Sequence, residues 1–287
     1  MNIILIILVF GVIVFFHEFG HFIVAKMNKI AVMEFSIGMG PAIFSVQKKE
    51  TKYSLRLLPI GGYCMMMGED GESEDENAFN NKPLLARILV IAAGPVFNFI
   101  LAFVFSIVLI HFTGCDPATL TTVVEHSAAE EAGIVVGDTV TAINGKHIYN
   151  YREILLYMMS EDASKPVTLS VEHADGTKDS VVVTPKVDKE GNYKLGVAGG
   201  YIASDGFGND LKYAGLELRY WMKATVTGLR MIVTGGVKNG DIMGPVGVGN
   251  AMNDVIEEAK DVSTTRKEAV INVLLNLMNW SILLSVN

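Results

Sequence analysis

The chain has 287 residues, half of which are hydrophobic, and a formal net charge of −8. With a mean hydropathy of +0.37, this composition excludes an ordinary soluble protein and makes a membrane protein the first hypothesis. The acidic balance and the lack of any run of Lys or Arg argue against nucleic acid as a partner and against a polybasic lipid-binding patch.

The first segment, residues 1–26, is predicted to be a transmembrane helix. Residues 3–25 are apolar apart from His17, Glu18 and His21. At ~1.5 Å per residue, this run is long enough to cross the ~30 Å hydrocarbon layer. It has neither a basic region before it nor a small-residue cleavage site, so we expect it to remain as an anchor.

Residues 27–83 are predicted to form a cytoplasmic loop, because they are rich in Lys and Arg and positively charged loops stay inside. The N-terminus then lies outside, and residues 17–21 lie toward the cytoplasmic face. Alternating residues predict a β-hairpin with strands near 43–48 and 53–58, ended by Pro59. The acidic residues 69–76 are interpreted as a solvated loop.

A second transmembrane helix is predicted at residues 84–112, with Gly94 and Pro95 inside it. Proline removes one helical hydrogen bond, so we expect neighbouring protein or water to satisfy the freed carbonyl. Residues 115–200 turn polar and show short strands, turns and two helices, which predict a small α+β domain on the extracytoplasmic side. Residues 201–268 are predicted to be amphipathic and interfacial, and residues 269–287 a third transmembrane helix, cut short.

The sequence HEFGH at residues 17–21 points to metal chemistry. Residues four apart share one face of a helix, so His17 and His21 are predicted to bind one zinc ion, with Glu18 as the catalytic base. Inside a membrane segment these polar side chains cost several kcal/mol unless they are paired or bind a metal (roughly 3 kcal/mol each). Two alternatives stay open: a proton- or ion-relay transporter, and a membrane scaffold that is not catalytic.

Several motifs in order resemble the site-2 protease family of intramembrane zinc metalloproteases, in its bacterial RseP-type branch. They are HEFGH at 17–21, SIGMGP at 36–41, PIGGY at 59–63, AGP at 93–95 with Asn98, and GPVG at 244–247. The resemblance implies a polytopic α-helical membrane protein with a membrane-reentrant β-hairpin and an inserted, PDZ-like α+β domain. It also implies a location in the bacterial inner membrane, with the active site toward the cytoplasm.

The same resemblance implies a third zinc ligand, an Asp in a Leu-Asp-Gly motif that follows the Asn-rich section of the third span. The 287 residues contain no such motif, and residues 283–287 resemble the stretch that leads into it. We therefore expect the chain to stop before its third ligand, to bind Zn²⁺ weakly and to cleave nothing by itself.

In function, the resemblance implies an endopeptidase that cuts the transmembrane segments of single-span proteins, such as anti-sigma factors or signal-peptide remnants, after another protease has trimmed them. The hairpin is expected to pair with the unwound substrate, and the PDZ-like domain to act as a size filter or, as the alternative, to bind peptides. The predicted substrate-binding residues are Gly38, Met39, Gly40, Tyr53, Leu55 and Asn287.

Overall fold

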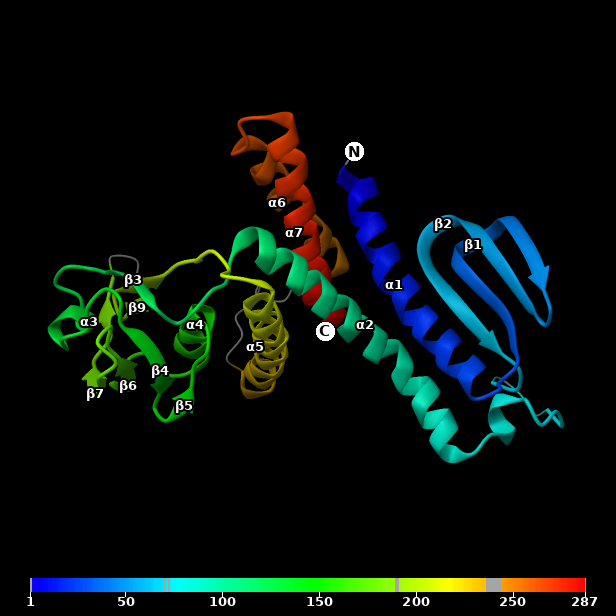
Figure 1. Ribbon diagram of the computed structural model, residues 1–287, viewed down its shortest axis with the longest axis horizontal. Coiled ribbons are helices and arrows are strands. Elements are labelled where there is room, and N and C mark those ends of the chain that lie inside the picture. Colours follow the sequence, from blue (N-terminus) through cyan, green and yellow to red (C-terminus); the bar gives the residue numbers. More distant parts are fainter. Residues whose placement is uncertain (1, 70, 72, 189–190, 236–243, 287) are drawn as a thin grey trace. The chain divides into compact units, whose positions relative to one another are not determined.

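The computed structural model describes residues 2–69, 71, 73–188, 191–235 and 244–286 (Figure 1). The chain divides into two compact units. The first comprises Met1–Ser106 and Met243–Asn287, and the second is Ile107–Ile242.

Three helices in the described part of the chain are long and apolar enough to cross a membrane: α1 (Asn2–Met27), α2 (Leu84–Thr113) and α7 (Arg266–Val286). The structure has a helix at each of the three predicted spans, with bounds that differ by a few residues. α2 continues through Pro95 rather than ending there. This assignment as candidate membrane spans rests on length and composition alone.

α6 (Pro245–Asp261) completes the helical part of the first unit. It starts at the Gly244-Pro245 pair, where the fixed φ of proline suits a first helical turn. Its buried side chains Met252 and Ile256 pack in one apolar cluster with side chains of α1, α2 and α7.

The predicted hairpin is present, formed by β1 (Val32–Lys48) and β2 (Thr51–Met66), which pair antiparallel. Its strands are much longer than predicted. The prediction was wrong in ending the second strand at Pro59, because register shifts in the pairing carry β1 past Pro41 and β2 past Pro59.

The hairpin packs against α1 through close backbone contacts (Figure 1). An ideal Cβ on Gly11 of α1 would lie 2.9 Å from the carbonyl oxygen of Pro59. One on Gly62 would lie 2.7 Å from the Ser36 carbonyl oxygen and 3.5 Å from Cγ of Glu18. Strand β2 therefore runs along the α1 face that carries Glu18, at a distance that only glycine permits.

The second unit contains the predicted α+β domain. Its strands are β3 (Leu120–Val123), β4 (Thr139–Ile143), β5 (Lys146–His147), β6 (Val167–Glu172), β7 (Lys178–Val183), β8 (Lys186–Val187), β9 (Tyr193–Lys194) and β10 (Val197–Gly199). Four of them form a sheet in the order β5-β4-β6-β7, and β10 pairs with β3 and β8 with β9. The helices α3 (Ala128–Glu131) and α4 (Tyr151–Ser160) were both predicted; the short 3₁₀ helix η1 (Phe79–Asn81), in the first unit, was not.

α5 (Phe207–Thr234) also belongs to the second unit, where it packs beside α4. Residues 201–268, predicted to be one interfacial segment, are thus divided: α5 lies in the second unit and α6 in the first. The division follows from side chains, since α5 carries cations that pair with the domain whereas α6 buries apolar side chains against α1 and α7.

Candidate active site

His17 and His21 lie one helical turn apart on α1. Their ring centroids are 4.9 Å apart and their planes meet at 76°. The sequence prediction that both imidazoles project from one face of a helix is consistent with this arrangement.

Helix α2 forms the surface that both imidazoles face. An ideal Cβ on Gly94 would lie 2.5 Å from Nε2 of His21 and 2.6 Å from Nε2 of His17. In α1, between the two histidines, an ideal Cβ on Gly20 would lie 2.5 Å from the carbonyl oxygen of Ala93. The two glycines let the helices approach closely, and the two Nε2 atoms converge on one spot that a larger residue would fill.

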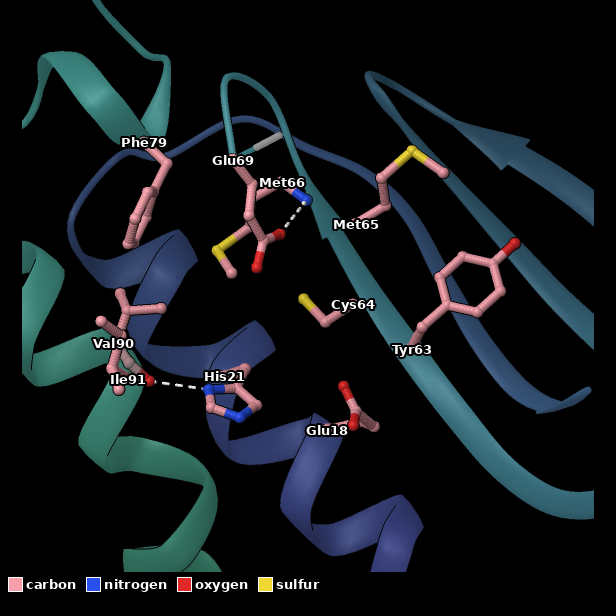
Figure 2. A pocket seen from close by; sticks show the side chains of 10 residues that line it. All are labelled: Glu18, His21, Tyr63, Cys64, Met65, Met66, Glu69, Phe79, Val90 and Ile91. Carbon is pink, nitrogen blue, oxygen red and sulfur yellow. Dashed lines mark hydrogen bonds between the residues drawn. The ribbon is translucent and has the colours of Figure 1, made fainter. Parts of the chain in front are cut away.

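The other ring nitrogen of His21 is held by the backbone of α2. Its Nδ1 lies 2.7 Å from the carbonyl oxygen of Val90 (Figure 2). Pro95 has no N–H for the carbonyl of Ile91, which loosens this turn of α2. A bond to a carbonyl requires the proton on Nδ1, which leaves the lone pair on Nε2.

The side-chain amide of Asn98 lies beside the corresponding ring nitrogen of His17, with Asn98 Nδ2 3.3 Å from His17 Nδ1. The Oδ1 atom of Asn98 is buried and has no hydrogen-bond partner among the described residues. A half turn of the amide lets Oδ1 accept from Nδ1–H of His17, which satisfies the orphaned oxygen and again leaves Nε2 with the lone pair.

These residues fit two ligands of a metal site. Both Nε2 atoms point to one place, and both Nδ1 atoms have the partners that fix the rings of metal-binding histidines. Among the described residues, no group of three or more His, Cys, Asp or Glu side chains could hold a metal ion. The described part of the chain therefore supplies two of the ligands that a tetrahedral zinc site needs.

Glu18 and His21 open onto a cavity of about 660 Å³ between α1, α2 and the end of β2 (Figure 2). Its other lining residues are Tyr63, Cys64, Met65, Met66, Glu69, Phe79, Val90 and Ile91. The volume lies within the usual range for ligand sites. Glu69, which the sequence analysis assigned to a solvated loop, lines this cavity and accepts a hydrogen bond of 3.4 Å from the backbone N–H of Met66.

The predicted substrate-binding residues do not lie together. Tyr53 and Leu55 belong to an inner strand segment, because each pairs with β1 at two places: Tyr53 with Phe35 and Val46, and Leu55 with Ile37 and Phe44. Their backbones therefore have no free edge for a substrate.

Residues 38–40 lie where the pairing shifts register, and Met39 and Gly40 are exposed. An ideal Cβ on Gly61 would lie 3.0 Å from the Met39 side chain, so this side chain lies against β2 at Gly61. Asn287 lies outside the described residues. Val90 and Glu69 were missed as site residues, Val90 because its contribution is a backbone carbonyl that no sequence pattern reports.

Comparison with known proteins gives the same result as the geometry. Residues 5–281 match the sequence profile of Peptidase family M50. A relative from Clostridium acetobutylicum that is named as a zinc metalloprotease is 36% identical, and the match covers 86% of this chain and 73% of the relative. The regulator of sigma-W protease RasP of Bacillus subtilis is 28% identical, with 95% and 84% covered.

Among solved structures, a PDZ domain of an SdrC-like protein from Listeria innocua is 21% identical and covers 29% of this chain and 93% of its own. Its TM-score is 0.26. The match over residues 5–281 confirms the resemblance found in the sequence: the chain belongs to peptidase family M50.

Proposed function

We propose that this protein is a zinc endopeptidase of the bacterial inner membrane that cuts the transmembrane segments of single-span proteins. The observation that carries the proposal is the convergence of the His17 and His21 Nε2 atoms on Gly94, beside Glu18 and a cavity. The relatives named zinc metalloprotease support the choice of metal.

The chain's own residues divide the work in three. His17 and His21 would hold the zinc ion through Nε2, while Val90 and Asn98 keep the rings oriented. A bound zinc ion supplies Lewis acidity at the scissile carbonyl. Glu18 takes the proton from the attacking water and passes it to the leaving amine nitrogen.

The hairpin is proposed to hold the substrate. Helical peptide bonds in a membrane are already hydrogen-bonded, so a transmembrane substrate must unwind before it can be cut. An extended segment recovers those hydrogen bonds by pairing with backbone groups of a strand. The segment of β2 that lines the cavity, residues 63–66, is suited to this because it pairs with β1 on one side only; Tyr53 and Leu55 are not.

The substrates are proposed to be anti-sigma factors or signal-peptide remnants that another protease has trimmed. A relative named regulator of sigma-W protease supports the first class. The Lys- and Arg-rich loop supports an active site toward the cytoplasm and an α+β domain outside, where the domain would exclude untrimmed ectodomains.

The test is Glu18→Gln in the full-length protein, reconstituted with a single-span model substrate. We expect zinc content to stay at the wild-type level and cleavage to fall by a factor of about 10²–10⁴, the usual share of a general base. Full cleavage by Glu18→Gln would contradict the role of Glu18. Proton-coupled flux into liposomes without cleaved product would favour a transporter. The absence of both flux and cleavage would favour a scaffold.

A further inference from the structure

Arg56 of β2 is bound on every side by groups of the hairpin. Its Nε donates to Oγ of Ser36 (2.9 Å) and its Nη1 to the carbonyl oxygen of Gly40 (2.7 Å). Its Nη2 donates to Oε1 of Glu34 (2.8 Å) and also to the hydroxyl of Tyr63. The guanidinium also lies 5.0 Å from the centroid of the Tyr63 ring.

This network is polar and largely shielded from solvent. The side chains of Arg56 and Glu34 are 19% and 11% exposed, while Leu57 and Leu58 beside them are exposed. Ser54 also donates to Glu34 (2.5 Å), so the buried carboxylate is well satisfied. A buried ion pair of this kind contributes little net stability compared with apolar side chains of the same volume, so stability alone does not account for it.

The network holds the segment 38–40. Gly38 and Gly40 have φ angles of +85° and +83°, a conformation that glycine adopts without strain. Arg56 binds the Gly40 carbonyl directly. It reaches the Gly38 carbonyl through Ser36, whose hydroxyl accepts from Arg56 and lies 3.4 Å from that oxygen. Both glycine carbonyls are therefore held toward the guanidinium, with the exposed Met39 between them.

The network approaches the catalytic face of α1 at Gly62. The Ser36 carbonyl is the atom that an ideal Cβ on Gly62 would meet at 2.7 Å, and the next is Cγ of Glu18 at 3.5 Å. One residue thus joins the Arg56 network to the strand that lies against Glu18.

We propose that Arg56 is a positioning residue that fixes residues 38–40 of β1, so that this bulged segment presents the exposed Met39 to an extended substrate. The inference rests on the proposed function, since it assigns a part of the same site. It adds a residue that touches neither the metal ligands nor the substrate.

The experiment compares Arg56→Ala with wild type in the full-length protein, reconstituted with the single-span model substrate. Loss of a charge-assisted hydrogen bond to the presenting segment weakens substrate and transition state alike. We expect KM to rise about tenfold or more, with kcat within about threefold of wild type. In Arg56→Lys a single ammonium group replaces the guanidinium, whose three nitrogen atoms all donate hydrogen bonds. The KM of this variant should therefore lie between those of wild type and Arg56→Ala.

Two further variants separate positioning from folding. Glu34→Gln combined with Arg56→Met removes both charges and leaves no unpaired ion, yet it still releases the Gly40 carbonyl, so KM should again rise. Lys48→Ala removes an exposed cation of the same hairpin and should match wild type. A fall in kcat at unchanged KM, or wild-type KM in the double variant, would overturn the proposal.

Amide hydrogen exchange gives an independent readout that needs no cleavage. Peptides covering residues 36–42 should exchange about tenfold faster in both Arg56→Ala and the double variant but not in Lys48→Ala, with zinc content unchanged. Wild-type exchange in these variants would refute the positioning role. A wild-type protein that shows this protection but cuts no membrane substrate would instead refute the proposed function alone.

Discussion

Because Gly94 has no side chain, the two histidines have room to share a metal. Both Nε2 atoms lie within 2.6 Å of the place where a side chain would begin. Gly20 has the matching role in α1, where the carbonyl of Ala93 occupies the space of a Cβ. The glycine inside HEFGH is thus a packing requirement between two helices, whereas the glycine of the distant AGP motif forms part of the site.

Gly94→Ala should therefore weaken metal binding without unfolding the protein. Alanine favours a helix over glycine by about 0.5–1 kcal/mol, so α2 itself is not weakened. The new methyl group would displace both imidazoles, and we expect zinc affinity to fall by about 10–100-fold, as when the support of a metal ligand is lost. Metal content after dialysis against competing chelators measures this.

The matched control is Gly228→Ala in α5, where no atom lies within 4 Å of the ideal Cβ. It should bind zinc as wild type does. If Gly94→Ala also bound zinc with wild-type affinity, the two Nε2 atoms would not converge as described.

At the scale of elements, the sequence predicted the three long helices, the hairpin and most elements of the soluble domain, since each has a strong local signal. It predicted the hairpin strands too short because Pro41 and Pro59 resemble strand ends, and only tertiary packing decides that bulges absorb them. The same bulges placed Tyr53 and Leu55 inside the sheet rather than at an edge. Arg56 had an unused signal: Glu34, Ser36, Ser54 and Arg56 alternate at spacing two, as polar residues sharing one face do.

The attachment of α5 to the α+β domain could also not be predicted from the sequence, because it depends on buried ion pairs between residues that are far apart along the chain. Arg152 of α4 binds Oδ2 of Asp116 at 3.0 Å and both carboxylate oxygens of Glu217 in α5. The side chains of Asp116 and Glu217 are only 5% and 8% exposed. Burial raises the pKa of Asp116 even though Arg152 opposes the shift.

Arg152→Ala would leave both carboxylates buried without their cation, which costs about 3–5 kcal/mol of unfolding free energy. A buried acid with a raised pKa binds its proton more tightly in the folded state, so the free energy of unfolding falls as pH rises. The loss should thus be larger at pH 8 than at pH 5.5. Urea midpoints followed by pulse proteolysis of the second unit measure it.

Lys165→Ala serves as the comparison, because its pair with Asp162 is exposed and should contribute about 0–1 kcal/mol. An Arg152→Ala protein as stable as Lys165→Ala, or equally stable at both pH values, would mean that the network does not hold α5.

At the scale of the whole molecule, the chain combines apolar helices that carry the histidines with a soluble domain that has its own core. The sequence predicted His17, Glu18 and His21 because their spacing is set by one helix. The features of α2 that complete the site were visible only as a Gly-Pro pair and an asparagine, whose roles depend on how two helices cross.

The central claim, that two histidines of a membrane helix hold a zinc ion that enables peptide hydrolysis, is tested most directly by removing the metal. Full-length protein in liposomes should stop cutting a single-span substrate when a chelator strips its zinc, and should recover when stoichiometric zinc is returned; His17→Ala should not recover. Cleavage that continues in metal-free protein, or that zinc restores equally to His17→Ala, would contradict the account.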